Sequence, residues 1–157
     1  MKFLINTNWK MKKNKKLTQK KLLFINTSKN NQLDVFLLSD HKILDKLSLE
    51  GNFKVSENLL KLINKLLKKN KIELVQLKGI IAVSGPGPFT SLRIAVAVAN
   101  TLSFALRIPV AGIANKDNLL DLQLIKKGVK EINKARVGNY IHPFYNQEPN
   151  IILVKKY

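Results

Sequence analysis

Short apolar runs separated by polar turns predict three strands in the first third of the sequence. The runs cover residues 22–25, 33–38 and 43–49. Two turns rich in Lys, Asn, Asp and Ser separate them, at residues 29–31 and 39–41. Connections this short join antiparallel neighbours. We therefore expect an antiparallel meander.

After Gly51 and Asn52 the spacing of apolar residues becomes helical. The repeating positions are Val55, Leu59, Leu62, Ile63, Leu66 and Leu67. One apolar stripe at this spacing predicts an amphipathic helix, here Ser56–Lys69. Ser56 is the expected N-cap, Glu57 lies in the positive first turn, and lysines occupy the negative last turn.

The second half of the pattern alternates between strand and helix. Residues 80–83 and 109–113 are short apolar runs, typical of buried parallel strands. Helices are expected at 89–107 and at 117–126, which gives a right-handed βαβ unit followed by a helix. Together with the meander, this predicts a mixed five-stranded sheet with helices on its faces, the topology of a ribonuclease H-like or actin-like half domain.

The helix at 89–107 is apolar on most of its faces. A single sheet covers only one side of a helix, so the other side is expected to meet a partner. Small residues permit close approach of helices, and we place Ala95, Ala99 and Leu102 on the partner side. No uninterrupted apolar run reaches the length of about 18 residues that a membrane span needs.

We expect three parts along the chain. Residues 1–20 form a mobile basic lead-in without the features of a secretory signal. Residues 21–128 form the half domain. Residues 129–157 form the remnant of a second lobe made only of strands, with strand-like pieces at 131–136, 139–145 and 151–155.

Composition adds charge and excludes cysteine chemistry. The 157 residues contain 28 Lys and Arg against 10 Asp and Glu, a formal charge of +18, and no Cys. Disulfides and thiolate metal sites are therefore excluded, and a reducing cytosol is expected. The charge is compatible with RNA binding, but the lysines are scattered and no paired RNA-binding aromatic motif is present. A solvated basic surface and an RNA-binding module both remain open.

The turn between the strand at 80–83 and the next helix is the most distinctive motif. It comprises Gly85, Pro86, Gly87, Phe89 and Thr90. A glycine turn before a helix start has free N–H groups that suit an anion. It lacks the Gly-Lys-Ser/Thr of a Walker loop. A tight connection without a ligand explains the same residues.

The run GPGPFTSLR at residues 85–93 resembles the GPGSFTGLR signature of the bacterial TsaB (YeaZ) family of tRNA threonylcarbamoyladenosine biosynthesis proteins. Further similarity lies, in family order, at residues 23–28, 55–60, 108–113 and 133–140. It covers residues 21–147 and implies an actin-like lobe. The family normally has a second lobe of similar size, of which this chain has only the first strands.

The resemblance implies a cytoplasmic, non-catalytic scaffold that docks through two helices onto the catalytic paralogue TsaD. Ser56, Glu57, Leu60 and Arg93 are the further residues expected at that interface. TsaD would transfer the threonylcarbamoyl group to adenosine 37 of tRNA with the ATPase TsaE, and a homodimer is an alternative pairing. ATP and a divalent metal are expected in the partner subunits and none in this chain. Contact with tRNA would come through the complex.

Several positions depart from the family pattern. Asn26 stands where the family usually has Asp, so the first strand ends without the carboxylate that an actin-like phosphotransferase uses for Mg²⁺. Other departures are Val55, Pro88, Ser91 and Asn133. His41 and His142 have no metal-ligand spacing. A nucleotide-binding or peptidase-like enzyme of the same superfamily remains the alternative.

Overall fold

A computed structural model describes residues 19–145 of the chain. Its centre is a five-stranded sheet in the order β3-β2-β1-β4-β5. The strands are β1 (Lys21–Asn26), β2 (Gln32–Ser39), β3 (Lys42–Glu50), β4 (Leu77–Gly85) and β5 (Val110–Ala114). The first three pair antiparallel, and β1, β4 and β5 pair parallel. The predicted mixed sheet of an actin-like half domain is confirmed.

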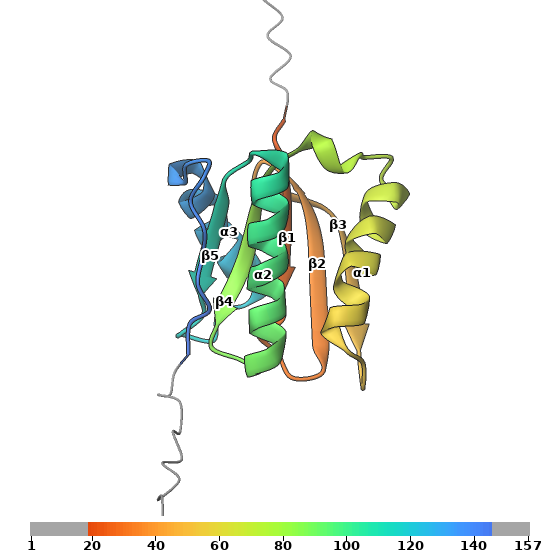
Figure 1. Ribbon diagram of the computed structural model, residues 1–157, viewed down its shortest axis with the longest axis vertical. Coiled ribbons are helices and arrows are strands. Elements are labelled where there is room, and N and C mark those ends of the chain that lie inside the picture. Colours follow the sequence, from red (N-terminus) through yellow and green to blue (C-terminus); the bar gives the residue numbers. More distant parts are fainter. Residues whose placement is uncertain (1–18, 146–157) are drawn as a thin grey trace, which may run out of the picture.

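Helices cover both faces of the sheet (Figure 1). Two helices, α1 (Val55–Lys69) and α2 (Phe89–Leu106), lie on one face, and α3 (Asp121–Lys134) lies on the other. A short 3₁₀ turn, η1 (Leu74–Gln76), leads from α1 toward β4. Each face has its own apolar core, because alternate residues of a strand point to opposite sides.

Helix α1 begins one residue earlier than predicted. Its N-cap is Lys54, which has an extended backbone and makes no side-chain capping bond. The predicted N-cap, Ser56, lies inside the first turn and is exposed, so that assignment is wrong. Lys54 instead pairs with Glu57 at 3.1 Å, an acid placed where the helix dipole favours it.

Helix α3 lies further along the chain than the predicted 117–126. The Asn115 side chain closes a loop through two hydrogen bonds with the backbone of Leu119, and Asn118 has a positive φ of 50°. A helix cannot pass through such a residue. The strand predicted at 131–136 is also wrong, because Ile132 continues the buried stripe of α3 begun by Leu124 and Gly128.

Helix α2 buries its small residues against its own sheet. Ala95 and Ala99 have no exposed surface and belong to the core beneath α1 and α2. Their placement at a partner surface is therefore wrong. Over its 18 residues α2 has the length and composition of a membrane span. One such helix is weak evidence for a membrane, because a helix that packs on a sheet passes the same test.

Residues 135–145 run beside α2 and β5 without forming the strand predicted at 139–145 (Figure 1). The Asn100 side chain holds this segment by two 2.9 Å hydrogen bonds, one donated to the carbonyl of Ile141 and one accepted from its N–H. The N–H of Phe144 also donates to the Ser84 carbonyl at 2.7 Å. The strand predicted at 151–155 and lead-in residues 1–18 lie outside the described residues.

Candidate functional site

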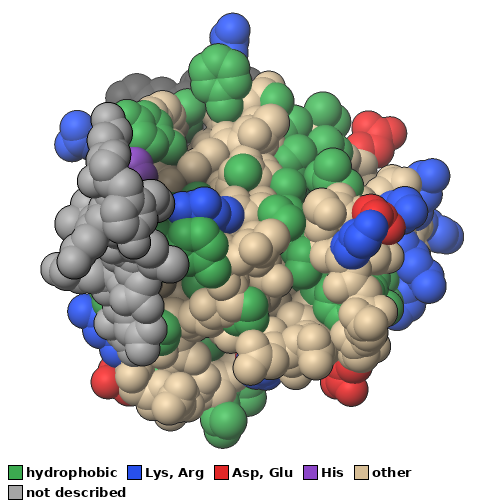
Figure 2. Space-filling model, turned by 60° about the horizontal axis from the view of Figure 1, so that its bottom comes forward, with side chains coloured by type: hydrophobic (Ala, Val, Ile, Leu, Met, Phe, Trp, Pro, Cys, Tyr) green, Lys and Arg blue, Asp and Glu red, His purple; other side chains and the backbone are tan. Residues whose placement is uncertain are grey.

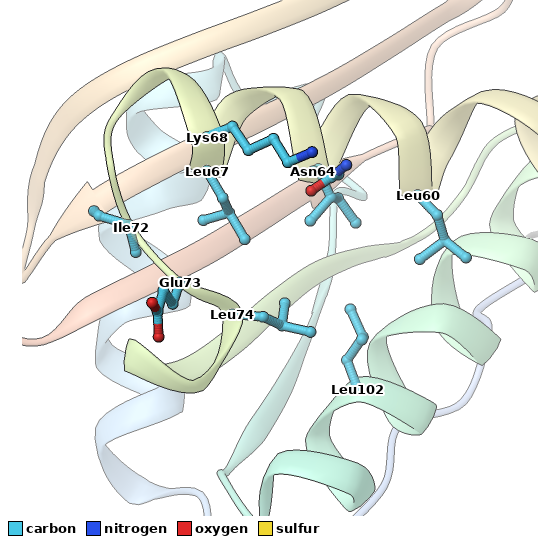
Figure 3. A pocket seen from close by; sticks show the side chains of 9 residues that line it. Leu60, Asn64, Leu67, Lys68, Ile72, Glu73, Leu74 and Leu102 are labelled. Carbon is cyan, nitrogen blue, oxygen red and sulfur yellow. The ribbon is translucent and has the colours of Figure 1, made fainter.

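An apolar groove with a volume of about 440 Å³ lies between α1 and α2. Figure 3 shows Leu60 of α1, Leu102 of α2 and Leu74 of η1 pointing into the same space. Leu60 is 54% exposed and Leu74 is 37% exposed. The groove exists because two helices on one sheet face diverge, and no other element of the described chain fills the gap.

Polar residues border this groove on the α1 side. Asn64 and Lys68 lie one turn apart on α1, and Glu73 follows the helix. In Figure 2, hydrophobic side chains reach the surface in the middle of the view, and basic side chains gather at its right edge. An apolar centre with a polar rim is the arrangement found at protein interfaces.

The residues predicted at the partner interface fall into three groups. Leu60 and Leu102 lie together in the groove. Ser56, Glu57 and Arg93 are exposed in the first turns of α1 and α2, and both helices begin at the lower end of the molecule in Figure 1. Ala95 and Ala99 lie in the core, as described above.

The glycine turn is a junction of three backbone segments. The Gly85 carbonyl accepts a 2.7 Å hydrogen bond from the N–H of Asn115, and the Thr27 hydroxyl donates to the Ser91 carbonyl at 3.2 Å. A Cβ at Gly85 would collide with the carbonyl of Phe144, and a Cβ at Gly87 would lie 2.7 Å from the Cα of Ser28. Close backbone contacts therefore explain both glycines without a ligand. Pro86 lies in the turn, whereas Phe89 and Thr90, which were predicted there, are the first residues of α2.

At the carboxyl end of β1, polar side chains form a network on the α3 side of the sheet. We name Asn26, Lys29, Asp34, Lys46 and Asp121 the β1-end network. The carboxylate of Asp34 is fully buried and lies 3.2 Å from Lys46 and 3.7 Å from Lys29. Asp121 pairs with the same two lysines at 3.4 and 3.3 Å. Two acids and two bases thus balance each other.

Asn26 fits this network as an amide. It is 2% exposed, donates to Asp121 at 3.3 Å, and accepts from the N–H and hydroxyl of Ser28 at 3.0 and 2.7 Å. A carboxylate in its place would face Asp121 with the same charge. Asp34 was not singled out in the sequence, although a lone charge inside the apolar strand at 33–38 was a visible signal.

Residues 19–145 contain no group of three or more His and acidic residues suited to a metal ion. His142 packs edge-on against Tyr140, with ring centres 5.6 Å apart, and His41 is exposed in the turn between β2 and β3. Hydrogen bonds from Lys69 and Asn70 lower the pKa of Asp45, which ties the end of α1 to β3.

Comparison with known proteins links this fold to tRNA modification proteins. Residues 53–129, from the start of α1 into α3, match the family model described as "TsaD: tRNA N6-adenosine threonylcarbamoyltransferase". Among solved structures, YeaZ from Pseudomonas aeruginosa is similar with a TM-score of 0.56 and 30% identity, over 60% of this chain and 44% of that one. Two curated relatives carry the TsaB name.

The tRNA threonylcarbamoyladenosine biosynthesis protein TsaB of Buchnera aphidicola subsp. Schizaphis graminum is 41% identical over 56 residues. The protein of the same name from the Acyrthosiphon pisum subspecies is 32% identical over 74 residues. The chain is therefore similar to proteins of the TsaB (YeaZ) family over part of its length. The matched segments cover 36% and 47% of this chain, and 27% and 34% of these TsaB proteins.

Proposed function

We propose that this TsaB-like chain is a non-catalytic subunit of the machinery that makes threonylcarbamoyladenosine in tRNA, and that it docks onto TsaD through α1 and α2. The α1/α2 groove carries the proposal. Its apolar side chains would be covered by helices of a partner built on the same half domain. The family relatives named above support the choice of pathway.

The occupant we favour is a pair of helices from TsaD. The groove lies between two helices that begin at the same end of the molecule, and a related half domain would present the same pair of helices (Figure 1). Docking would bury the 54% of Leu60 that is exposed, which contributes about 1 kcal/mol. A second copy of this chain is the alternative occupant where TsaD is absent.

The β1-end network supports the absence of catalysis in this chain. Its lysines are already neutralised by Asp34 and Asp121, and Asn26 gives no charge to a metal ion. In this role ATP, the divalent metal and TsaE act with TsaD, and tRNA is modified on the assembled complex. We place the complex in the cytoplasm.

Reconstituted modification tests the proposal. Purified TsaD and TsaE, tRNA and a threonylcarbamoyl donor are combined with wild-type chain, with Leu60→Asp, or with Leu122→Asp as control. Leu122 is 63% exposed on α3, on the other side of the sheet. We expect the wild type and Leu122→Asp to support modification and Leu60→Asp to fail. Equal activity of all three, or modification without the chain, would overturn the proposed role.

A further inference from the structure

The exposed aromatic residues are concentrated on one side of the molecule. Phe24 and Phe36 are buried in the sheet core. Phe53 is partly buried before α1, and the other five aromatic residues within 19–145 lie on α2 or on the segment beside it, namely Phe89, Phe104, Tyr140, Phe144 and Tyr145. We name these five the aromatic edge. Phe104 is 86% exposed, Tyr140 is 69% exposed and Phe89 is 46% exposed.

Cations accompany these rings at the N-terminal end of α2. The guanidinium carbon of Arg93 lies 3.7 Å from the ring centre of Phe89, and its Nε donates to the Tyr145 hydroxyl at 2.9 Å. Phe89 and Tyr145 stack with ring centres 4.6 Å apart. Lys116 Nζ lies 4.6 Å from the ring centre of Phe144. These contacts place the rings and the positive charges next to one another on the surface.

A hollow of about 440 Å³ lies at the other end of α2. Its lining includes the rings of Phe104 and Tyr140 and the exposed side chain of Arg107. Along α2, Phe104 is about 22 Å from Phe89 at 1.5 Å per residue. Ring surfaces and guanidinium groups therefore occur at two places along one edge.

Acidic residues avoid this surface. Residues 85–116 and 135–145 contain no Asp or Glu, whereas the other described segments contain nine. No carboxylate within residues 19–145 pairs with Arg93, Arg107 or Lys116. Glu131 borders the edge near Tyr140 and pairs with Lys134 at 3.2 Å. The cations of the edge thus have no acidic partner in the described chain, as is also the case for many lysines elsewhere on its surface.

We infer that the aromatic edge binds single-stranded RNA. Unpaired bases stack on exposed rings and on guanidinium planes, and phosphates are attracted to unpaired cations. A duplex hides the faces of its bases, so it would use the charges alone. Aromatic residues and arginine are also enriched in protein interfaces, so a protein partner is the outcome from which the test below separates RNA. The inference does not require that α1 and α2 dock onto TsaD, so either can fail alone.

Fluorescence anisotropy of the full chain tests this surface. The probes are a labelled unpaired RNA of about 12 nucleotides and a duplex RNA of the same length. The aromatic variants are Phe104→Ala and Tyr140→Ala, with Leu122→Ala as the control for loss of an exposed apolar side chain. Arg107→Ala is matched by Lys65→Ala, which removes an exposed charge from α1.

We expect the chain to bind the unpaired RNA more tightly than the duplex. Each aromatic variant should weaken binding of the unpaired RNA by about fivefold or more, because stacking on one ring is lost. That ratio should persist as salt is raised, although every affinity falls. Arg107→Ala should cost more than Lys65→Ala, and Leu122→Ala should change little.

Two results would overturn the inference. The first is equal affinity for unpaired and duplex RNA, or none for either, with the aromatic variants no weaker than Leu122→Ala. Any RNA binding would then be explained by nonspecific charge alone. The second is unchanged RNA binding combined with loss of TsaD binding in Phe104→Ala and Tyr140→Ala. It would assign the edge to a protein.

Discussion

The two faces of the sheet are closed in different ways. On the α1/α2 face, two helices cover the strands but leave the apolar groove that contains Leu60 and Leu102 open to solvent. On the α3 face, a single helix leaves β2 and β3 less covered, yet Phe36 there is only 2% exposed. The amino group of Lys46 lies 4.8 Å from its ring centre, so the lysine stem shields the ring.

This difference favours the α1/α2 face as the one that would bind a partner. On the α3 face the charged groups pair with one another, since the buried Asp34 and the lysines around it form a balanced network. The groove has no such closure within the described chain, and only its rim is polar. An apolar groove left open on one face, with a closed polar network on the opposite face, favours docking at α1 and α2.

The largest expected effect is on the free energy of unfolding, and it differs between the buried and the exposed side of α2. Ala99→Glu places a carboxylate in a fully buried position and should cost more than about 3 kcal/mol of unfolding free energy. Ala97→Glu, at an exposed position of the same helix, should leave stability nearly unchanged. Thermal unfolding of both variants measures this. A stable Ala99→Glu variant would mean that α2 is rotated relative to the sheet.

The β1-end network gives the next largest effect. Lys46→Met keeps the apolar stem over Phe36 but removes the charge nearest to the buried carboxylate of Asp34. Because the Lys46 side chain is 35% exposed and Lys29 remains, we expect a loss of about 1–2 kcal/mol. Denaturant unfolding of Lys46→Met, Asp34→Asn and the double variant gives the coupling energy. A coupling of zero would mean that the pairing of Lys46 with Asp34 adds nothing to stability.

A smaller effect tests why Asn26 replaces the family's usual acid. Asn26→Asp puts a second carboxylate beside Asp121 and should cost about 1 kcal/mol. Adding Asp121→Asn should restore most of the loss, because the amide and the acid have then exchanged places. Unfolding curves of the two variants decide this. An Asn26→Asp variant as stable as the wild type would show that the lysines accommodate a third acid.

The smallest effect concerns pH at the end of α1. Since Lys69 and Asn70 lower the pKa of Asp45, its ionised form stabilises the fold. This contribution is present above the ordinary pKa of about 4 and is lost as the pH falls through the lowered pKa. Asp45→Asn should therefore lose less of its melting temperature on acidification than the wild type. Identical pH profiles would show that the tie between α1 and β3 adds nothing.

The sheet could be predicted because its strands are short apolar runs with polar turns at both ends. Pairing then followed from the length of the connections. The boundaries of α3 could not be read in the same way. The loop that precedes α3 depends on one side chain, Asn115. The prediction of a strand at 131–136 did not take the helical spacing of Ile132 into account.

The site was predicted only in part. Leu60 and Leu102 lie together in the groove between α1 and α2, and their place in a partner interface stays a prediction. The small residues of α2 were assigned to the wrong side, because an apolar helix offers no periodicity to orient it. Ala95 and Ala99 serve close packing on the sheet instead. The contact of Asp34 with residues far along the chain required the folded structure.

Affinity for TsaD tests the central claim most directly. TsaD from the same cell is titrated with the wild-type chain, with Leu60→Asp, and with Leu122→Asp as the control on α3. We predict that Leu60→Asp lowers the affinity by tenfold or more, about 1.4 kcal/mol, while its melting temperature and the affinity of Leu122→Asp stay unchanged. Wild-type affinity in Leu60→Asp, or a stronger loss in Leu122→Asp, would contradict docking at the α1/α2 groove.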